Sequence, residues 1–235
     1  MVVIATECLP TMRPLIDFHR AGDAQALAQD LADFVAHCLT DTLRKQDRAL
    51  LVVSGGSTPG PFFDALSRKD IPWGQVVITL ADERWVSPNH PDSNERLVRQ
   101  RLLQGPAAEA IWMPFWREEM NTHEALHHVC GELDALPWPA SVVILGVGSD
   151  GHTASLFPHD ASWVESGPDP DRCLAIPAPM PPNVPVSRLS LSPTCLMDAE
   201  QVVIHLTGEA KWAVLQHAEQ EGSAHDYPIR LAWQQ

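Results

Sequence analysis

Apolar residues recur along this chain at two alternating spacings, which predict helices and strands in turn. From residue 23 to about residue 45 they recur every three or four positions, which predicts a helix with one buried face. The recurring residues are Leu27, Leu31, Phe34, Cys38 and Leu39. Residues 49–53 then form a short, continuously apolar run, which is typical of a strand covered on both faces.

The same succession of strand, polar loop and helix repeats along the rest of the chain. A helix that begins near Pro59 or Pro61 should follow the first strand, because proline fits the first turn of a helix. Further strands are predicted at residues 76–80, 141–145 and 201–206. Further helices are predicted at about residues 93–103, 122–136 and 208–220.

Two segments in the second half of the chain are less regular. Residues 158–185 contain eight prolines and are expected to be mostly loop, with a candidate strand at residues 173–176. Residues 188–192 alternate between apolar and polar side chains, which favours an edge or mixed strand.

This order of elements predicts an α/β fold. We expect a single domain, residues 1–235, built on a doubly wound, largely parallel sheet with helices on both faces. In such folds, ligands bind outside the carboxyl ends of the strands. Three segments with unusual residues directly follow apolar strands and should therefore meet at that edge. They are residues 54–58, 82–84 and 148–152.

Composition narrows the classes of function. Of the 235 residues, 45% are hydrophobic, which is enough for a substantial core. No apolar run approaches the ~18 residues that a membrane span needs, and the first residues resemble no secretory signal. The net charge of -14 argues against nucleic acid or an anionic membrane as a partner. An anionic substrate would have to be held by a few locally placed cations.

The cysteines are scattered and include no C-x-x-C pair. They are Cys8, Cys38, Cys130, Cys173 and Cys195. This odd number without a pairing pattern indicates reduced thiols of a cytoplasmic protein, with packing in the core as their main role.

Residues 54–58, Ser54-Gly55-Gly56-Ser57-Thr58, form a loop of small residues between a strand and a helix. Glycines let backbone N–H groups approach an anion, and the hydroxyl groups and the helix N-terminus add further donors. The loop lacks the G-K-[S/T] of a nucleotide-binding P-loop. Phosphate binding and an ordinary tight turn both remain open from this motif alone.

Residues 146–151 match the dinucleotide-binding pattern G-x-G-x-x-G. The match lies past the middle of the chain, and Pro158 ends any helix that follows, so a nicotinamide cofactor is not expected. His152 is more informative, because it lies in a glycine-rich turn beside Asp150 at the end of a strand. This setting favours acid–base chemistry over a structural role.

A second motif suggests a metal. His123, Glu124 and His127 form the pattern H-E-x-x-H, which binds zinc in some hydrolases. Here the pattern opens a predicted amphipathic helix far in sequence from the strand-end loops, so a solvated helix face is the simpler interpretation. No metal is predicted.

Three cations lie where strands give way to loops or helices. They are Arg84, Arg188 and Lys211. They could reach a common anion, the arginines as bidentate forks and the lysine as a point charge.

Four segments taken together resemble the 6-phosphogluconolactonase family. They are residues 54–59, Asp82-Glu83-Arg84 with Asn94, residues 146–158 and Thr207-Gly208-x-x-Lys211, and the match runs from about residue 49 to residue 220. The related glucosamine-6-phosphate deaminases carry tyrosine in place of Arg84 and a different sequence after the histidine. The family usually has threonine at positions 190 and 192, where this chain has serine and so keeps the hydroxyl groups.

The resemblance implies a Rossmann-like fold and the hydrolysis of 6-phospho-D-glucono-1,5-lactone in the oxidative pentose phosphate pathway, without a metal or other cofactor. It implies His152 as the general base, with Asp150 orienting it. The substrate-binding residues that it implies are Ser54, Gly55, Gly56, Ser57, Thr58, Asp82, Arg84, Asn94, Gly148, Gly151, Arg188 and Lys211.

The expected partner is a small sugar-phosphate lactone, and not nucleic acid or a membrane. The chain would act in the cytoplasm as a monomer or weak homo-oligomer. Two alternatives stay open: a non-catalytic sugar-phosphate-binding protein, and an isomerase or deaminase of the same fold.

Overall fold

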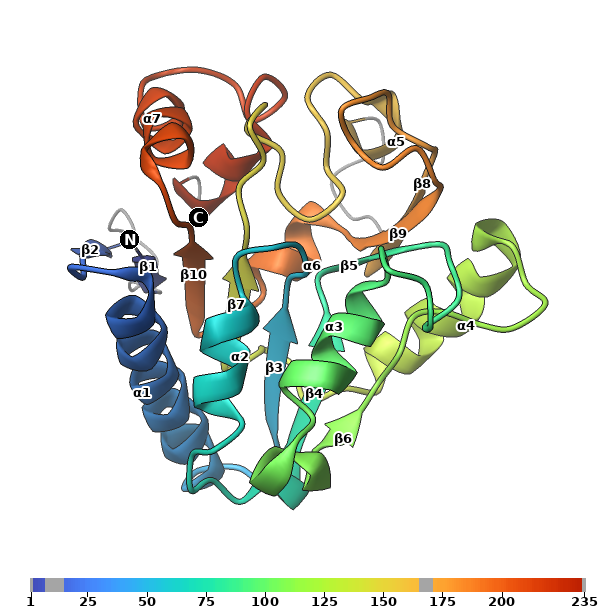
Figure 1. The fold of residues 1–235 in the computed structure, drawn as a ribbon. Helices are drawn as coiled ribbons and strands as arrows, with labels where there is room; N and C mark the ends of the chain where they lie inside the picture. The colour runs from blue at the N-terminus through green and yellow to red at the C-terminus, as the bar shows by residue number, and fades with distance from the viewer. Residues whose placement is uncertain (1, 7–14, 165–170, 234–235) are drawn as a thin grey trace.

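The computed structural model describes residues 2–6, 15–164 and 171–233 of the chain. The strands of its main sheet are β1 (Val2–Thr6), β2 (Leu15–His19), β3 (Ala49–Val53), β4 (Val76–Leu80), β6 (Ile111–Trp112), β7 (Val142–Leu145) and β10 (Gln201–His205). Their order across the sheet is β2-β1-β10-β7-β3-β4-β6 (Figure 1). Pairing is parallel from β10 to β6 and antiparallel where β1 and β2 extend the sheet.

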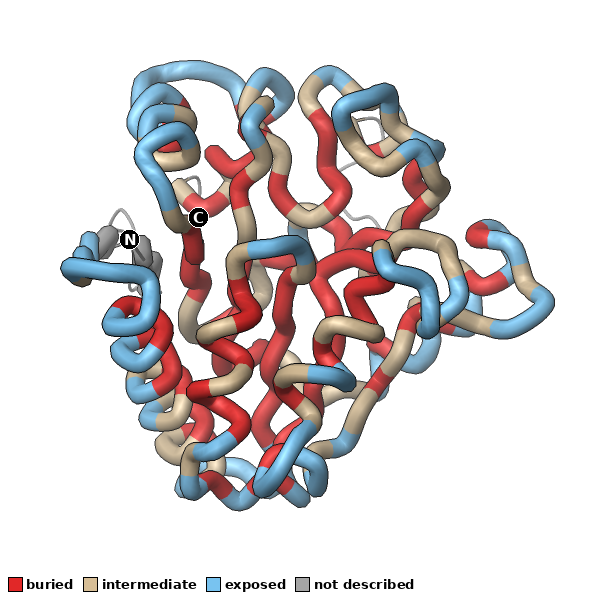
Figure 2. Tube along the Cα trace, in the orientation of Figure 1, coloured by how far each residue is buried: buried red, intermediate tan, exposed pale blue. Residues whose placement is uncertain are grey.

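The parallel strands explain both the apolar runs in the sequence and the position of the loops. β3, β4 and β7 are buried along their whole length, and apart from Thr79 their side chains are apolar on both faces (Figure 2). The register places Val53 of β3 beside Leu80 of β4. The chain therefore leaves both strands at the same edge of the sheet.

Helices cover both faces of the main sheet, and others lie beyond its carboxyl edge. The described helices are α1 (Ala24–Leu43), α2 (Gly60–Leu66), α3 (Asn94–Arg101), α4 (Thr122–Asp134), α5 (Ala161–Val164), α6 (Pro193–Met197) and α7 (Glu209–Ala218), with short 3-10 helices η1 (Trp73–Gln75), η2 (Gly105–Glu109) and η3 (Pro228–Trp233). α5 and α7 lie beyond the carboxyl edge (Figure 1). In Figure 1, α1, α2 and α3 lie in front of the sheet, and α4 and α6 lie behind it.

A second sheet of three antiparallel strands lies near the carboxyl edge of the first. Its strands are β5 (Asp82–Arg84), β9 (Arg188–Leu191) and β8 (Cys173–Ile176), in the order β5-β9-β8. Ala81 joins the two sheets, because its N–H donates to the carbonyl of Val53 and its own carbonyl accepts from the N–H of Leu191, at 2.9 and 2.8 Å. The small sheet is thereby held against the ends of β3 and β4.

The predicted doubly wound α/β fold is confirmed, and the predicted helices and strands appear with ends that differ by at most two residues. The prediction of an edge or mixed strand at residues 188–192 is wrong. β9 is the central strand of the small sheet, antiparallel to both neighbours, and all four of its residues are buried. β1, β2, β6, α5 and α6 are not predicted from the sequence, and each spans only two to five residues, too few for a clear period.

Two expectations from composition can be compared with the structure. Cys38, Cys130, Cys173 and Cys195 are free thiols, whereas Cys8 lies outside the described residues. Among the described helices, none combines the length and apolar character that a membrane span requires.

The start of α1 yields a test of local stability. The Asp23 carboxylate accepts hydrogen bonds from the N–H groups of Gln25 and Ala26, at 2.9 and 2.8 Å. We expect Asp23→Ala to lower the free energy of unfolding by about 1 kcal/mol, because both backbone N–H groups lose their hydrogen-bond acceptor. Urea unfolding measures this loss. Asp23→Asn keeps a capping oxygen and is the matched control, and equal losses in the two variants would contradict the capping role.

Candidate active site

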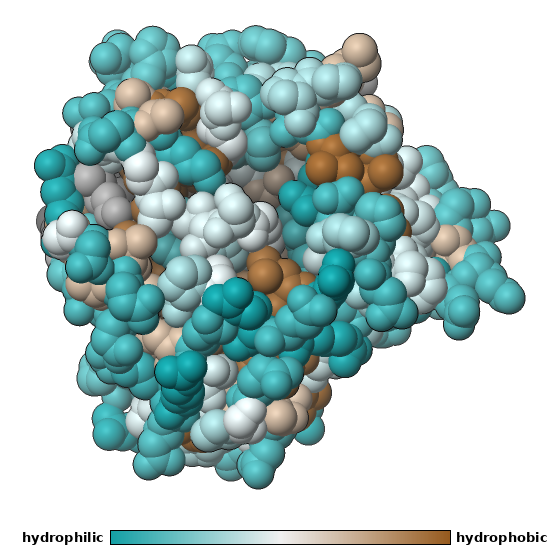
Figure 3. All heavy atoms as spheres, viewed as in Figure 1, coloured by the Kyte–Doolittle hydropathy of each residue, from teal (hydrophilic) through white to brown (hydrophobic). Residues whose placement is uncertain are grey.

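A cavity of about 240 Å³ opens at the carboxyl ends of the parallel strands. Segments that follow β3, β4, β7 and β10 contribute to its wall, together with α3 and β9. Figure 3 shows the molecular surface hollowed on this side of the molecule. The candidate residues from the sequence line this cavity, except Asp150 and Gly151. The prediction that the three strand-end loops meet is therefore confirmed.

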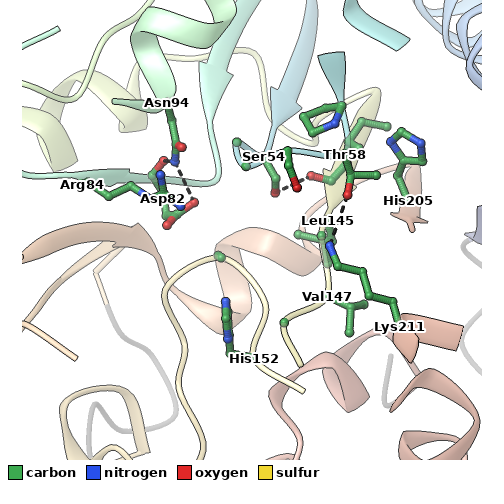
Figure 4. Close-up of a pocket in the computed structure, with 18 of the residues that line it drawn as sticks. Ser54, Thr58, Asp82, Arg84, Asn94, Leu145, Val147, His152, His205 and Lys211 are labelled. Carbon is green, nitrogen blue, oxygen red and sulfur yellow. Dashed lines mark hydrogen bonds between the residues drawn. The ribbon is translucent and has the colours of Figure 1, made fainter. Parts of the chain in front are cut away.

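His152 faces the cavity from the turn after β7 (Figure 4), and Asp150 holds its ring. Nδ1 of His152 lies 2.5 Å from Oδ1 of Asp150, and the same oxygen accepts the backbone N–H of His152 at 3.2 Å. Burial opposes ionisation of Asp150, but these hydrogen bonds and the charge of the imidazole outweigh it and lower the pKa of Asp150 to about 2. An ionised Asp150 accepts a hydrogen bond from Nδ1–H, so that Nε2 of the neutral His152 ring is left as a hydrogen-bond acceptor.

Glycine is required at two positions of this turn. A Cβ on Gly148 would lie 2.1 Å from Nδ1 of His152, so any side chain there would displace the imidazole. Gly151 has a φ of +84°, and a Cβ on it would lie 2.3 Å from the ring of Tyr227. The carbonyl of Gly151 also accepts the N–H of Ile229 at 3.0 Å. The C-terminal segment therefore supports the turn that carries His152.

Residues 54–58 and Lys211 form one end of the cavity. Nζ of Lys211 donates to Oγ1 of Thr58 at 3.2 Å, and burial lowers the pKa of this ammonium group. The hydroxyl of Ser54 is already used, because it donates to the carbonyl of Ile144 at 2.9 Å. Gly56 has a φ of +89°, which accounts for a glycine in this loop. One ammonium group and a loop with backbone N–H groups and hydroxyls thus lie side by side, as an anion site requires.

Asp82 and Arg188 lie on adjacent strands of the small sheet and form a buried ion pair. Oδ2 of Asp82 lies 3.7 Å from Nη1 of Arg188 and accepts the hydroxyl of Ser155 at 2.5 Å. Both side chains are less than one-tenth exposed. Burial lowers the pKa of Arg188, although the charge of Asp82 opposes this shift. A buried charge needs a partner, so this pair fixes both side chains in the wall.

Arg84 and Asn94 complete this wall. Nη1 of Arg84 donates to the carbonyl of Asp92 at 2.8 Å, and Nδ2 of Asn94 donates to the carbonyl of Asp82 at 2.8 Å. A Cβ on Gly55 would lie 1.8 Å from Oδ1 of Asn94, so only glycine fits beside this amide. Among the described residues, Nε of Arg84 and Oδ1 of Asn94 are buried without a hydrogen-bond partner. Unpaired buried polar atoms cost free energy, so a polar ligand here would improve the hydrogen bonding.

Glu83 lies behind the cavity and fixes the start of α3. Its carboxylate is fully buried and accepts the N–H groups of Arg84, Asn94 and Glu95 at 2.7 to 2.8 Å and the hydroxyl of Ser93 at 3.1 Å. Burial raises the pKa of Glu83 to about 7, although the backbone N–H groups favour its ionised form. This carboxylate positions Arg84 and Asn94, but Glu83 itself does not line the cavity.

The cavity also contains residues that the sequence analysis does not identify. His205 at the end of β10 lies 4% exposed, and burial and the charge of Lys211 lower its pKa to about 4. Asn183 and Ala154 also line the wall. His205 could have been found by the strand-end rule that identifies His152. Asn183 lies in the proline-rich segment and carries no such signal.

The H-E-x-x-H pattern has a structural explanation. The carboxylate of Glu124 accepts the N–H of Asn121 at 2.8 Å, and the side chain of Asn121 accepts the N–H of Glu124 in return. This reciprocal pair is a capping box at the start of α4. In the described part of the chain, no three His, Cys, Asp or Glu side chains are grouped so that they could hold a metal ion.

The turn around Gly151 yields a prediction for activity. We expect Gly151→Ala to lower kcat for lactone hydrolysis, the activity that the sequence predicts, by roughly 10- to 100-fold, because the clash with Tyr227 would displace His152. Steady-state kinetics measures this loss, and circular dichroism checks the fold. Gly74→Ala is the control, since a Cβ on Gly74 meets no atom within 4 Å. A kcat like that of the unaltered protein would show that the turn tolerates the shift.

Comparison with known proteins identifies the family of this chain. Residues 22–235 match the family described as glucosamine-6-phosphate isomerases/6-phosphogluconolactonase. A 6-phosphogluconolactonase of Pseudomonas aeruginosa is 40% identical over 89% of this chain and 87% of its own length, and one of Rhizobium meliloti is 38% identical over 91% and 92%. A crystal structure of a 6-phosphogluconolactonase from Shewanella baltica, 37% identical, superposes with a TM-score of 0.83 over 91% of this chain and 90% of that one. The chain therefore belongs to the glucosamine-6-phosphate isomerase/6-phosphogluconolactonase family.

Proposed function

We propose that this chain is a 6-phosphogluconolactonase that hydrolyses 6-phospho-D-glucono-1,5-lactone to 6-phospho-D-gluconate in the oxidative pentose phosphate pathway. Relatives at 38% to 40% identity over about nine-tenths of the chain carry this name. The observation that carries the mechanism is the pairing of His152 with Asp150 at 2.5 Å beside a cavity that also holds Lys211. A general base and a phosphate site thus lie in one space.

In this mechanism His152 acts as the general base. Nε2 takes a proton from a water molecule, and the water oxygen attacks the lactone carbonyl carbon, C1. The tetrahedral intermediate then collapses, the bond between C1 and the ring oxygen breaks, and the proton on Nε2 passes to the leaving ring oxygen. Asp150 stays ionised, because its pKa is about 2, and it stabilises the imidazolium that forms.

The cations of the cavity would bind the C6 phosphate of the substrate. We assign the contacts of this phosphate to Lys211, the loop of residues 54–58 and the two arginines, Arg84 and Arg188. Lys211 already lies against the loop, through Thr58, so little rearrangement is needed. Binding energy from the phosphate orients the lactone carbonyl toward His152 and the water, which lowers the barrier to attack.

We further infer that the chain acts as one domain, as a monomer or weak homo-oligomer in the cytoplasm, with no cofactor and no nucleic-acid or membrane partner. The charge of -14 supports the absence of nucleic-acid and membrane partners, and the scattered cysteines support the cytoplasm. Arg84 and the residues 155–158 differ from the deaminase pattern, which favours a lactonase over a deaminase.

The first test compares the unaltered protein with His152→Ala. Freshly generated 6-phosphogluconolactone is added, and proton release is measured and corrected for spontaneous hydrolysis. We expect His152→Ala to lower kcat by roughly 10²- to 10⁴-fold, as the loss of a general base does. His128→Ala on the exposed face of α4 is the matched control. No acceleration by the unaltered protein would instead favour a non-catalytic sugar-phosphate-binding protein.

The second test concerns the phosphate site. We expect Lys211→Met to raise KM by roughly 10- to 100-fold with kcat within a few-fold, because it removes a charge-assisted contact. Lys211→Arg should retain part of the affinity, and Lys45→Met on the exposed surface is the control.

Arg84→Ala should likewise act mainly on KM. A loss of kcat at unchanged KM would place Arg84 at the reacting carbonyl instead.

A further inference from the structure

Three cysteines gather outside the cavity, where α4 packs against the small sheet. Cys130 lies on α4 and is half-buried, whereas Cys173 begins β8 and Cys195 lies on α6, both at most 2% exposed. α4 contacts β8 and β9 directly. None of the three lines the cavity that holds His152. The catalytic mechanism therefore leaves this cluster unexplained.

Cys130 and Cys173 are in direct contact. Each thiol donates to a backbone carbonyl of the other element: Sγ of Cys130 to that of Cys173 at 3.6 Å, and Sγ of Cys173 to that of Leu126 at 3.8 Å. Both sulfur atoms therefore lie in the interface between α4 and β8.

The four described cysteines differ in how readily they ionise. Interaction with Cys173 lowers the pKa of Cys130, although burial and the charges of Asp171 and Asp134 oppose this shift. The same interaction and burial raise the pKa of Cys173, and burial raises the pKa of Cys38 and of Cys195 to about 12. Because the thiolate is the reactive form, Cys130 is the cysteine of this pair that favours reaction, and its sulfur contacts the backbone of Cys173.

We propose that Cys130 and Cys173 are an oxidisable dithiol that a hydroperoxide converts to an intrachain disulfide between α4 and β8. The Cys130 thiolate attacks one peroxide oxygen and breaks the O–O bond, which gives a sulfenic acid and, after proton transfer, water from hydrogen peroxide. Sγ of Cys173 then attacks the sulfenic sulfur, the S–S bond forms, and a second water leaves. Two thiols are oxidised and one peroxide is reduced.

The position of the pair gives the disulfide a defined structural effect. β8 is an edge strand of the small sheet, and its partner β9 carries Arg188 in the wall of the cavity. A covalent link from Cys130 to Cys173 would tie this sheet to α4. Neither sulfur lines the cavity, so the formation of the disulfide does not depend on the proposed lactonase activity.

The test oxidises the full chain and maps its cysteines. The folded protein is treated with hydrogen peroxide, free thiols are then alkylated under denaturing conditions, and peptides are analysed by mass spectrometry without reduction. We expect a linked pair of peptides that contain Cys130 and Cys173, two fewer alkylated thiols than the five in the sequence, and full recovery after dithiothreitol.

Single variants distinguish this pair from the other thiols. Cys195→Ser and Cys38→Ser should still form the link, whereas Cys173→Ser should abolish it and leave a sulfenic acid at Cys130 that dimedone traps. The proposal is overturned if all five thiols survive in the unaltered protein, or if Cys130 pairs with another cysteine or with a second chain. Because the decisive result comes from the unaltered protein, it stands even if a variant fails to fold.

Discussion

The parallel pairing of β3, β4, β7 and β10 is the constraint on which the rest of the molecule depends. Parallel strands end at the same edge of a sheet, so the segments that follow them must meet there. In this chain those segments carry the glycine-rich loop, the acidic and basic residues of β5, and the turn with His152. Residues that are about 100 positions apart in sequence, such as Ser54 and His152, thus line one cavity.

Charge is distributed to suit an anion in an acidic protein. The net charge of -14 repels anions at long range, yet Arg84, Arg188 and Lys211 all line the cavity. Each cation is held by a neighbour: Arg188 by Asp82, Arg84 by the carbonyl of Asp92, and Lys211 by Thr58. Because these three side chains are already held in place, few of them need to become ordered when an anion binds, which keeps the entropic cost of binding low.

The turn that carries His152 is supported from several directions. Asp150 holds the imidazole, Gly148 leaves room for it, and the C-terminal segment packs on Gly151 through Tyr227 and Ile229. The small sheet likewise holds Arg188 in the wall of the cavity. α4 packs against that sheet, with Cys130 and Cys173 at the contact. The contacts of the turn together hold the imidazole of His152 in a fixed position at the wall of the cavity.

The sequence by itself determined the α/β class and the main helices and strands, because apolar periodicity is a local signal. It also predicted that residues 54–58, 82–84 and 148–152 meet, through the common edge of parallel strands. Only the tertiary structure decided that residues 188–191 form a separate antiparallel sheet, that His205 and Asn183 line the cavity, and that Cys130 touches Cys173. The physical reason is that these contacts join segments far apart in sequence, whose pairing depends on how helices and sheets pack and not on any local pattern.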